Sequence, residues 1–181
     1  MWYYLFKYVL LGPILRVIGR PRIEGLENIP DTGAAILASN HLAVMDSFFL
    51  PLMVRRRIYF LAKSEYFTGT GLKGGFQRWF FTAVGQIPID RSGAQAAAGA
   101  LTAARSQLDK GELMGMYPEG TRSADGRLYK GKTGLARIAL DAGVQELDIV
   151  ANYGWIRGGE LQRVEDDLRA VIDVCHQAGV P

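Results

Sequence analysis

The sequence predicts an α/β domain in which a mixed sheet is flanked by helices, and three observations support this fold class. From residue 22 onward, short apolar runs of strand length alternate with longer segments of helical pattern. Of the 181 residues, 49% are hydrophobic and 22% are charged, which is typical of a globular protein. Neither a repeat of fixed period nor a low-complexity linker divides the chain. We therefore expect one folded core.

Strands and helices are expected to alternate along the body of the chain. The apolar runs that predict strands are residues 33–39, 57–62, 85–89, 113–117 and 147–151. The segments that predict helices are residues 47–54, 74–81, 94–109 and 134–142. Gly111 and Gly143 follow two of these helices closely, and glycine is a common helix stop. One more amphipathic helix is expected over residues 160–178.

Residues 1–20 are rich in aromatic and aliphatic side chains but do not fit a membrane-spanning helix. Such a helix needs about 20 mostly apolar residues, and Lys7, Pro13 and Arg16 interrupt this segment. No small-residue cleavage site follows, so a secretory signal does not fit either. Trp2 and the tyrosines that follow it are favoured at the depth of lipid headgroups. We expect an amphipathic membrane-interface segment; the alternative is a helix packed on the domain's own core.

The charges are distributed unevenly along the chain. Residues 145–181 hold three Arg and seven acidic residues, a net charge of −4, so the total of +3 leaves +7 for residues 1–144. The larger part should therefore favour an anionic partner such as a lipid headgroup or a phosphate compound. One Cys and two His argue against a disulfide and against a metal site. Because basic residues are scattered singly, we expect no nucleic-acid partner.

The first candidate site is the segment Asn40 to Asp46, between an expected strand and an expected helix. Ligands of α/β sheets bind beyond the carboxyl ends of strands. Five residues do not bring His41 and Asp46 to one helix face, so His41 must lie in the preceding turn with Asp46 reaching back. Such a pair can take a proton from a hydroxyl. Ser39 and Ser47 flank it and leave a Ser-His-Asp hydrolase open, although no G-x-S-x-G motif occurs.

Cationic residues follow the other expected strands. Lys63, Arg91 and Arg122 come directly or soon after three strands, and Lys130 and Lys132 lie further on. The guanidinium of Arg matches the oxygens of a phosphate group. If these strand ends share one edge of the sheet, the cations and His41 converge on one anionic ligand. The alternative for Arg91 is a surface salt bridge with its acidic neighbour.

The second candidate site is residues 117–123, YPEGTRS, directly after an expected strand. Gly120 lets the backbone approach a ligand closely, and Thr121 offers a hydroxyl donor beside Arg122. The same residues are also common in ordinary turns, so a plain strand-to-loop turn is the alternative.

Together these segments resemble the glycerolipid acyltransferase family, most closely its 1-acylglycerol-3-phosphate acyltransferases. The resemblance covers roughly residues 20–144 and is carried by NHLAVMD (40–46), FLAKSEYF (60–67), GQIPIDR (85–91), YPEGTRS (117–123) and GRLYKGKTGLARIAL (126–140). It implies a glycerol-3-phosphate acyltransferase-like fold. It also implies an enzyme that moves an acyl chain from acyl-CoA or acyl carrier protein to lysophosphatidate, making phosphatidate, with no bound cofactor.

The resemblance also implies roles for individual residues and a place in the cell. His41 would be the general base and Asp46 its partner. The residues that would bind substrates are Asn40, Lys63, Arg91, Glu119, Gly120, Thr121 and Arg122. Since the acceptor is a lipid, the protein would sit on the cytoplasmic face of the cell membrane as a peripheral or monotopic enzyme.

Residues 145–181 depart from the family pattern and weakly resemble a segment of deoxyribose-phosphate aldolase. They contain no lysine, so Schiff-base chemistry is not expected. We therefore divide the chain into a membrane segment (1–20), an acyltransferase domain (21–144) and a divergent tail (145–181). If the tail disables transfer, the alternatives are a non-catalytic phospholipid-binding module and a thioester hydrolase.

Overall fold

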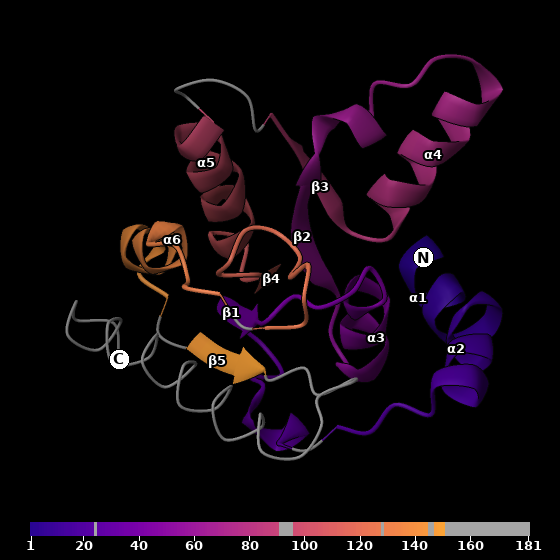
Figure 1. The fold of residues 1–181 in the computed structure, drawn as a ribbon, viewed down its shortest axis with the longest axis horizontal. Coiled ribbons are helices and arrows are strands. Elements are labelled where there is room, and N and C mark those ends of the chain that lie inside the picture. Colours follow the sequence, from indigo (N-terminus) through magenta and orange to yellow (C-terminus); the bar gives the residue numbers. More distant parts are fainter. Residues whose placement is uncertain (24, 91–95, 128, 145–146, 151–181) are drawn as a thin grey trace.

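A computed structural model describes residues 1–23, 25–90, 96–127, 129–144 and 147–150 (Figure 1). Its centre is a sheet of strands in the order β3-β2-β4-β1-β5. In chain order the strands are β1 (Ala35–Ser39), β2 (Ile58–Lys63), β3 (Gln86–Ile89), β4 (Leu113–Met116) and β5 (Leu147–Val150). All pairings between these strands are parallel. The predicted α/β class is confirmed, but the described sheet is parallel and not mixed.

The connections between the strands explain the parallel sheet. Each connection contains a helix, and these helices are α3 (Asp46–Met53), α4 (Gly71–Ala83), α5 (Ala96–Leu108) and α6 (Gly134–Ala142). A crossover through a helix returns the chain to the starting edge, so the next strand runs in the same direction. The helices and strands lie within a few residues of the predicted ranges. Strand β5 pairs with β1 at the edge of the sheet, whereas the helix expected over 160–178 lies outside the described residues.

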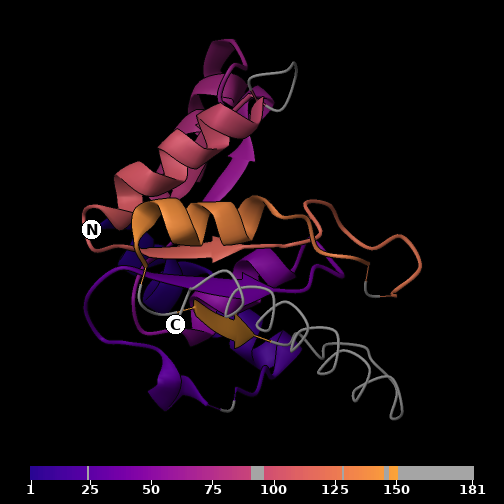
Figure 2. The ribbon, with the colours of Figure 1, turned by 90° about the vertical axis from the view of Figure 1, so that its left-hand side faces the viewer.

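The core lies on both faces of β1, whose five residues are all buried. Alternate side chains of a strand point to opposite faces. Ile36 and Ala38 accordingly pack with buried residues of α5 and α6, whereas Ala35 and Leu37 pack with residues of α3. Figure 2 shows α5 and α6 on one side of the sheet. Burial on both faces explains why β1 reads as a continuous apolar run.

The N-terminal segment forms α1 (Trp2–Leu5), a π-helical turn η1 (Phe6–Leu10) and α2 (Gly12–Gly19). Its inner side is bound to the end of α3. Tyr3 Oη donates to the carbonyl of Arg56 at 3.4 Å, Lys7 Nζ donates to that of Val54, and Arg16 donates to that of Leu52 at 3.4 Å. Cations are favourable at a helix C-terminus because its carbonyls carry partial negative charge.

The turn between η1 and α2 requires glycine. A Cβ atom on Gly12 would clash with the carbonyl oxygen of Lys7. Aromatic contacts then join this segment to α4, since the ring centroids of Trp2 and Trp79 are 5.2 Å apart and those of Phe6 and Phe80 also 5.2 Å. The alternative of a segment packed on its own domain is thus correct for this inner side.

The outer side of the N-terminal segment is exposed and apolar. Val17 and Ile18 in α2 are 74% and 77% exposed, and Leu72 and Phe76 in α4, which contacts the segment through Trp79, are 96% and 64% exposed. We call the exposed apolar residues of α2 and α4 the apolar face. No helix within the described ranges is both long enough and apolar enough to cross a bilayer.

Candidate active site

The two candidate segments meet because β1 and β4 are neighbours in the sheet. Ala38 is paired with Met116, so the loops after these strands leave the same edge side by side. The backbone N–H of Ser123 donates to the carbonyl of His41 at 2.8 Å and ties the two loops together. The expected convergence of the two loops is therefore present in the structure.

His41 lies in the turn before α3, and Asp46 is the first residue of that helix. The distance between His41 Nδ1 and Asp46 Oδ2 is 3.0 Å. The same carboxylate oxygen accepts the backbone N–H groups of Leu42 and Ala43, each at 2.7 Å. These bonds fix the carboxylate, which in turn holds Nδ1 and leaves Nε2 of the imidazole for a ligand. The geometry is the one expected from the five-residue spacing.

Tyr117 covers the face of the His41 ring. The two ring centroids are 3.8 Å apart and the planes are 10° from parallel. The phenol oxygen lies 3.0 Å from Ser47 Oγ, and burial raises the pKa of Tyr117 above its usual value. Sequence reasoning did not place Tyr117 or Ser47 against His41. Tyr117 is the first residue of the second candidate site and Ser47 follows Asp46, but neither pattern predicts that their hydroxyls meet.

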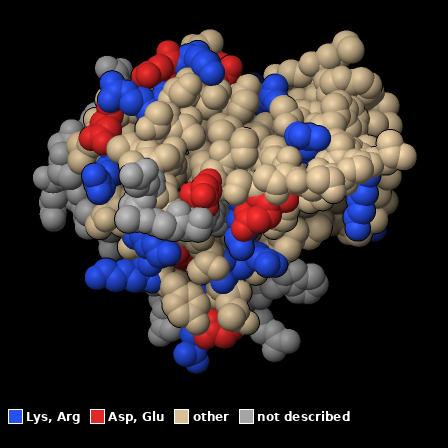
Figure 3. Space-filling view, turned by 90° about the horizontal axis from the view of Figure 1, so that it is seen from above, with Lys and Arg blue, Asp and Glu red and all other residues tan. Residues whose placement is uncertain are grey.

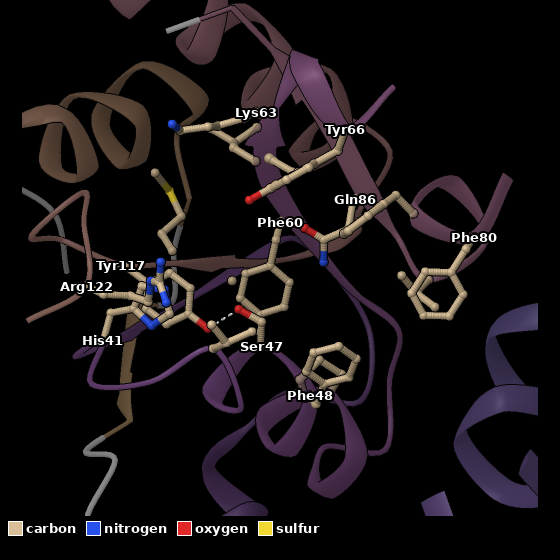
Figure 4. A pocket seen from close by; sticks show the side chains of 18 of the residues that line it. His41, Ser47, Phe48, Phe60, Lys63, Tyr66, Phe80, Gln86, Tyr117 and Arg122 are labelled. Atoms are coloured by element: carbon tan, nitrogen blue, oxygen red, sulfur yellow. Dashed lines mark hydrogen bonds between the residues drawn. The ribbon is translucent and has the colours of Figure 1, made fainter. Parts of the chain in front are cut away.

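A cavity of about 700 Å³ opens beside His41 (Figure 4). His41, Thr121 and Arg122 line one part of it, and Ser47, Phe48 and Phe60 line the next. It continues to the N-terminal segment, where its lining includes Tyr3, Phe6, Lys7 and Leu11. Because Lys7 is bound at the far end of α3, the cavity extends along the whole of that helix. Most of its lining is apolar, so it suits a hydrocarbon chain next to a polar mouth.

The remaining predicted residues take different places. Lys63 and Gly120 line the cavity, and the φ angle of 72° at Gly120 favours glycine. Asn40 and Glu119 are buried and are not among the lining residues. Arg91 lies outside the described residues.

Glu119 is close to the histidine and carboxylate pair. Burial raises the pKa of Glu119, against the opposing effect of the nearby backbone and ring of His41. Both carboxylate oxygens of Glu119 are buried without a hydrogen-bond partner among the described residues, so the carboxyl is available to a polar group of a ligand. The described residues hold no group of three or more His, Cys, Asp or Glu side chains that could bind a metal ion.

The surface above the sheet carries its charged side chains unevenly. Figure 3 shows Lys and Arg interspersed with Asp and Glu over the α6 side and the middle of this surface, while the part over α4 carries few charged side chains.

Comparison with known proteins supplies the family. A family profile described as Acyltransferase matches residues 20–151, which is well over half of the chain. The chain belongs to the acyltransferase family. The match spans both candidate segments and ends at the first residue after β5.

Individual relatives carry a more specific name. A chloroplastic 1-acyl-sn-glycerol-3-phosphate acyltransferase of Arabidopsis thaliana is 33% identical over 128 residues, covering 70% of this chain and 34% of the relative. An enzyme of the same name from Pseudomonas aeruginosa is 32% identical over 143 residues, covering 77% and 53%. The acyltransferase chain thus spans between a third and about half the length of these relatives.

The fold is similar to that of a solved relative. The crystal structure of the 1-acyl-sn-glycerophosphate acyltransferase of Thermotoga maritima matches with a TM-score of 0.53 at 24% identity, over 83% of this chain and 70% of that one. A similarity to deoxyribose-phosphate aldolase is found as well. Over 41 residues the chain is 44% identical to that enzyme of Mannheimia succiniciproducens. That match covers only 23% of this chain and 18% of the aldolase.

Proposed function

We propose that the protein transfers a fatty acyl chain from an acyl thioester, acyl-CoA or acyl carrier protein, to the free hydroxyl of lysophosphatidate, forming phosphatidate. The observation that carries this proposal is the His41 and Asp46 pair at the polar mouth of a long apolar cavity. The family membership and the names of the relatives support the same reaction.

His41 acts as the general base in this mechanism. Its Nε2 takes the proton of the lysophosphatidate hydroxyl as the oxygen attacks the thioester carbonyl. When the tetrahedral intermediate collapses, the carbon–sulfur bond breaks and the thiolate takes the proton from the imidazolium. Asp46 keeps the ring in the required tautomer and stabilises its charged form. No covalent acyl-enzyme is required.

Cations at the mouth of the cavity hold the acceptor's phosphate. Arg122 and Lys63 line the cavity, and Thr121 lies beside them with its hydroxyl. Arg91 joins this set by resemblance. Holding two substrates in reactive geometry lowers the barrier by about 7–11 kcal/mol, so anchoring the phosphate contributes to catalysis as well as to binding.

The apolar face provides contact with the membrane surface. The exposed apolar side chains of α2 and α4 form surface that water solvates poorly, and Arg20 and Arg22 follow α2 in sequence. Peripheral attachment at the cytoplasmic face would bring the cavity to its lipid acceptor. No metal or other cofactor takes part in the proposed reaction.

Thiol release from acyl-CoA, with and without lysophosphatidate, tests the proposed function. We expect thiol release that depends on lysophosphatidate and equals the phosphatidate formed. His41→Ala should lower kcat by a factor of about 10²–10⁴ while lysophosphatidate still binds. Thiol release independent of the acceptor would instead identify a thioester hydrolase. Lipid binding by a wild-type protein without turnover would identify a binding module.

A further inference from the structure

The imidazole of His41 is constrained on its face as well as on its edge. Asp46 holds the ring at Nδ1, and one hydrogen bond at the ring edge does not by itself fix the tilt of the ring plane. Tyr117 lies flat against the ring at 3.8 Å and fixes this tilt. Tyr117 itself stacks with Phe60 of β2, at 5.7 Å and 20°. The face of His41 therefore rests on rings that are fixed to the sheet.

The hydroxyl of Tyr117 is anchored to the helix that carries Asp46. Tyr117 Oη and Ser47 Oγ are 3.0 Å apart, although the two residues are 70 positions apart in sequence. A phenylalanine would fill the same space, and a buried hydroxyl without a partner would be unfavourable. Ser47 supplies that partner. The first two residues of α3 thus hold His41 twice, directly through Asp46 and indirectly through Ser47 and Tyr117.

We propose that Tyr117 and Ser47 are a positioning pair that fixes the plane of the His41 ring and so keeps Nε2 directed into the cavity. The π face of Tyr117 also stabilises the imidazolium that forms when His41 accepts the substrate proton. This inference rests on the proposed role of His41 as general base. It adds two residues that act through His41. Figure 4 shows the Ser47 and Tyr117 hydroxyls joined beside the His41 ring.

Steady-state kinetics of four variants test the pair. Tyr117→Phe and Ser47→Ala should each lower kcat about three- to tenfold with little change in KM, the range expected for one hydrogen bond. The double variant should lose no more than either single one, because both remove the same bond. Tyr117→Leu, which also removes the stacked ring, should lower kcat about 100-fold. Tyr59→Phe and Ser106→Ala, which lie away from the cavity lining, are the matched controls.

A nuclear magnetic resonance measurement tests the stack without turnover. Ring protons of a histidine that lies over a tyrosine ring are shifted upfield, and the His41 signals are assigned by their loss in His41→Gln. We expect the upfield shift in the wild type and in Tyr117→Phe, and its loss in Tyr117→Leu.

Three results would overturn the positioning pair. The first is an unchanged kcat in Tyr117→Leu. The second is a double variant whose fold-loss in kcat equals the product of the two single losses. The third is a His41 spectrum that does not respond to Tyr117→Leu. A wild type without acyl transfer would refute the proposed function alone, since the ring-proton shift would still report whether the stack exists.

Discussion

At the scale of single residues, the site depends on side chains that accept several hydrogen bonds at once. One oxygen of Asp46 accepts two backbone N–H groups and faces Nδ1 of His41. The backbone bonds fix the carboxylate in one rotamer, so its position does not depend on substrate. Preorganisation of this kind lets a base act without rearranging during the reaction.

The Asp46→Asn variant tests whether the negative charge of Asp46 is needed, because asparagine has nearly the same shape. An amide can still accept the backbone bonds but removes the negative charge that favours the imidazolium. We expect kcat to fall by a factor of about 10² or more, with a melting temperature close to that of the wild type. Asp109→Asn, at an exposed position directly after α5, is the matched control. Equal kcat values for Asp46→Asn and the wild type would contradict the assigned role.

Lys7 gives the protein a pH-dependent stability. Burial lowers the pKa of Lys7 to about 8, whereas it titrates near its ordinary value of 10.5 in the unfolded chain. Between these values the unfolded chain binds more protons, so the free energy of unfolding rises with pH. The urea midpoint should therefore increase from about pH 8 to about pH 9.5. This range stays below the window in which Tyr3, whose pKa burial raises to about 12, acts in the opposite direction.

Lys7→Met should abolish that increase, because it removes the titrating group. Lys110→Met, at an exposed position, should retain it. A urea midpoint with the same pH dependence in Lys7→Met and in the wild type would show that another group is responsible.

At the scale of elements, the spacing of apolar residues predicted the strands and helices but not which strands lie next to each other. The runs that became β1 and α6 were visible because apolar residues repeat locally, and the terminal glycine of α6 marked its end. The order of the strands was not visible, since no local pattern specifies that β4 lies between β1 and β2. The stack of Tyr117 on His41 was missed for the same reason. It joins residues that are distant in sequence and follows from strand order alone.

The π-helical turn offers a test at this scale. Gly12→Ala would place a methyl group against the carbonyl of Lys7 and should destabilise the fold by about 1–3 kcal/mol. Gly75→Ala in α4 meets no atom within 4 Å and should stabilise the fold by about 0.5–1 kcal/mol. Urea unfolding of both variants measures the difference, and equal effects would show that the close approach at Gly12 is unimportant.

At the scale of the whole molecule, the cavity and the apolar face share the N-terminal segment. Phe6 and Lys7 line the cavity from within, and Val17 and Ile18 face outward from the same segment. The sequence predicted a segment suited to a membrane interface and, as an alternative, one packed on the domain. In the structure, the inner residues of this segment are buried against the domain, whereas its outer residues are exposed.

A double variant, Val17→Glu with Ile18→Glu, tests the membrane contact. Since burying each aliphatic side chain contributes about 1.5–3 kcal/mol, partitioning onto vesicles should fall about tenfold or more. Vesicles of phosphatidylcholine and phosphatidylglycerol, sedimented with the protein, give the measurement. Leu140→Glu in α6 changes an exposed residue on the other side of the sheet and should leave partitioning unchanged. An equal loss of vesicle partitioning in the double variant and in Leu140→Glu would argue against membrane contact through the apolar face.

The docking of the N-terminal segment on α3 has a consequence for biosynthesis. Tyr3 bonds to the backbone of Arg56 and Ile58, so the residues of this segment are made before their binding site, which is synthesised some fifty residues later. Until then their aromatic side chains have only solvent or lipid to contact, and such exposed surface favours aggregation. We expect a higher yield of folded protein when synthesis or refolding takes place with lipid vesicles present. A yield of folded protein that does not change on adding vesicles would show that this delay does not promote aggregation.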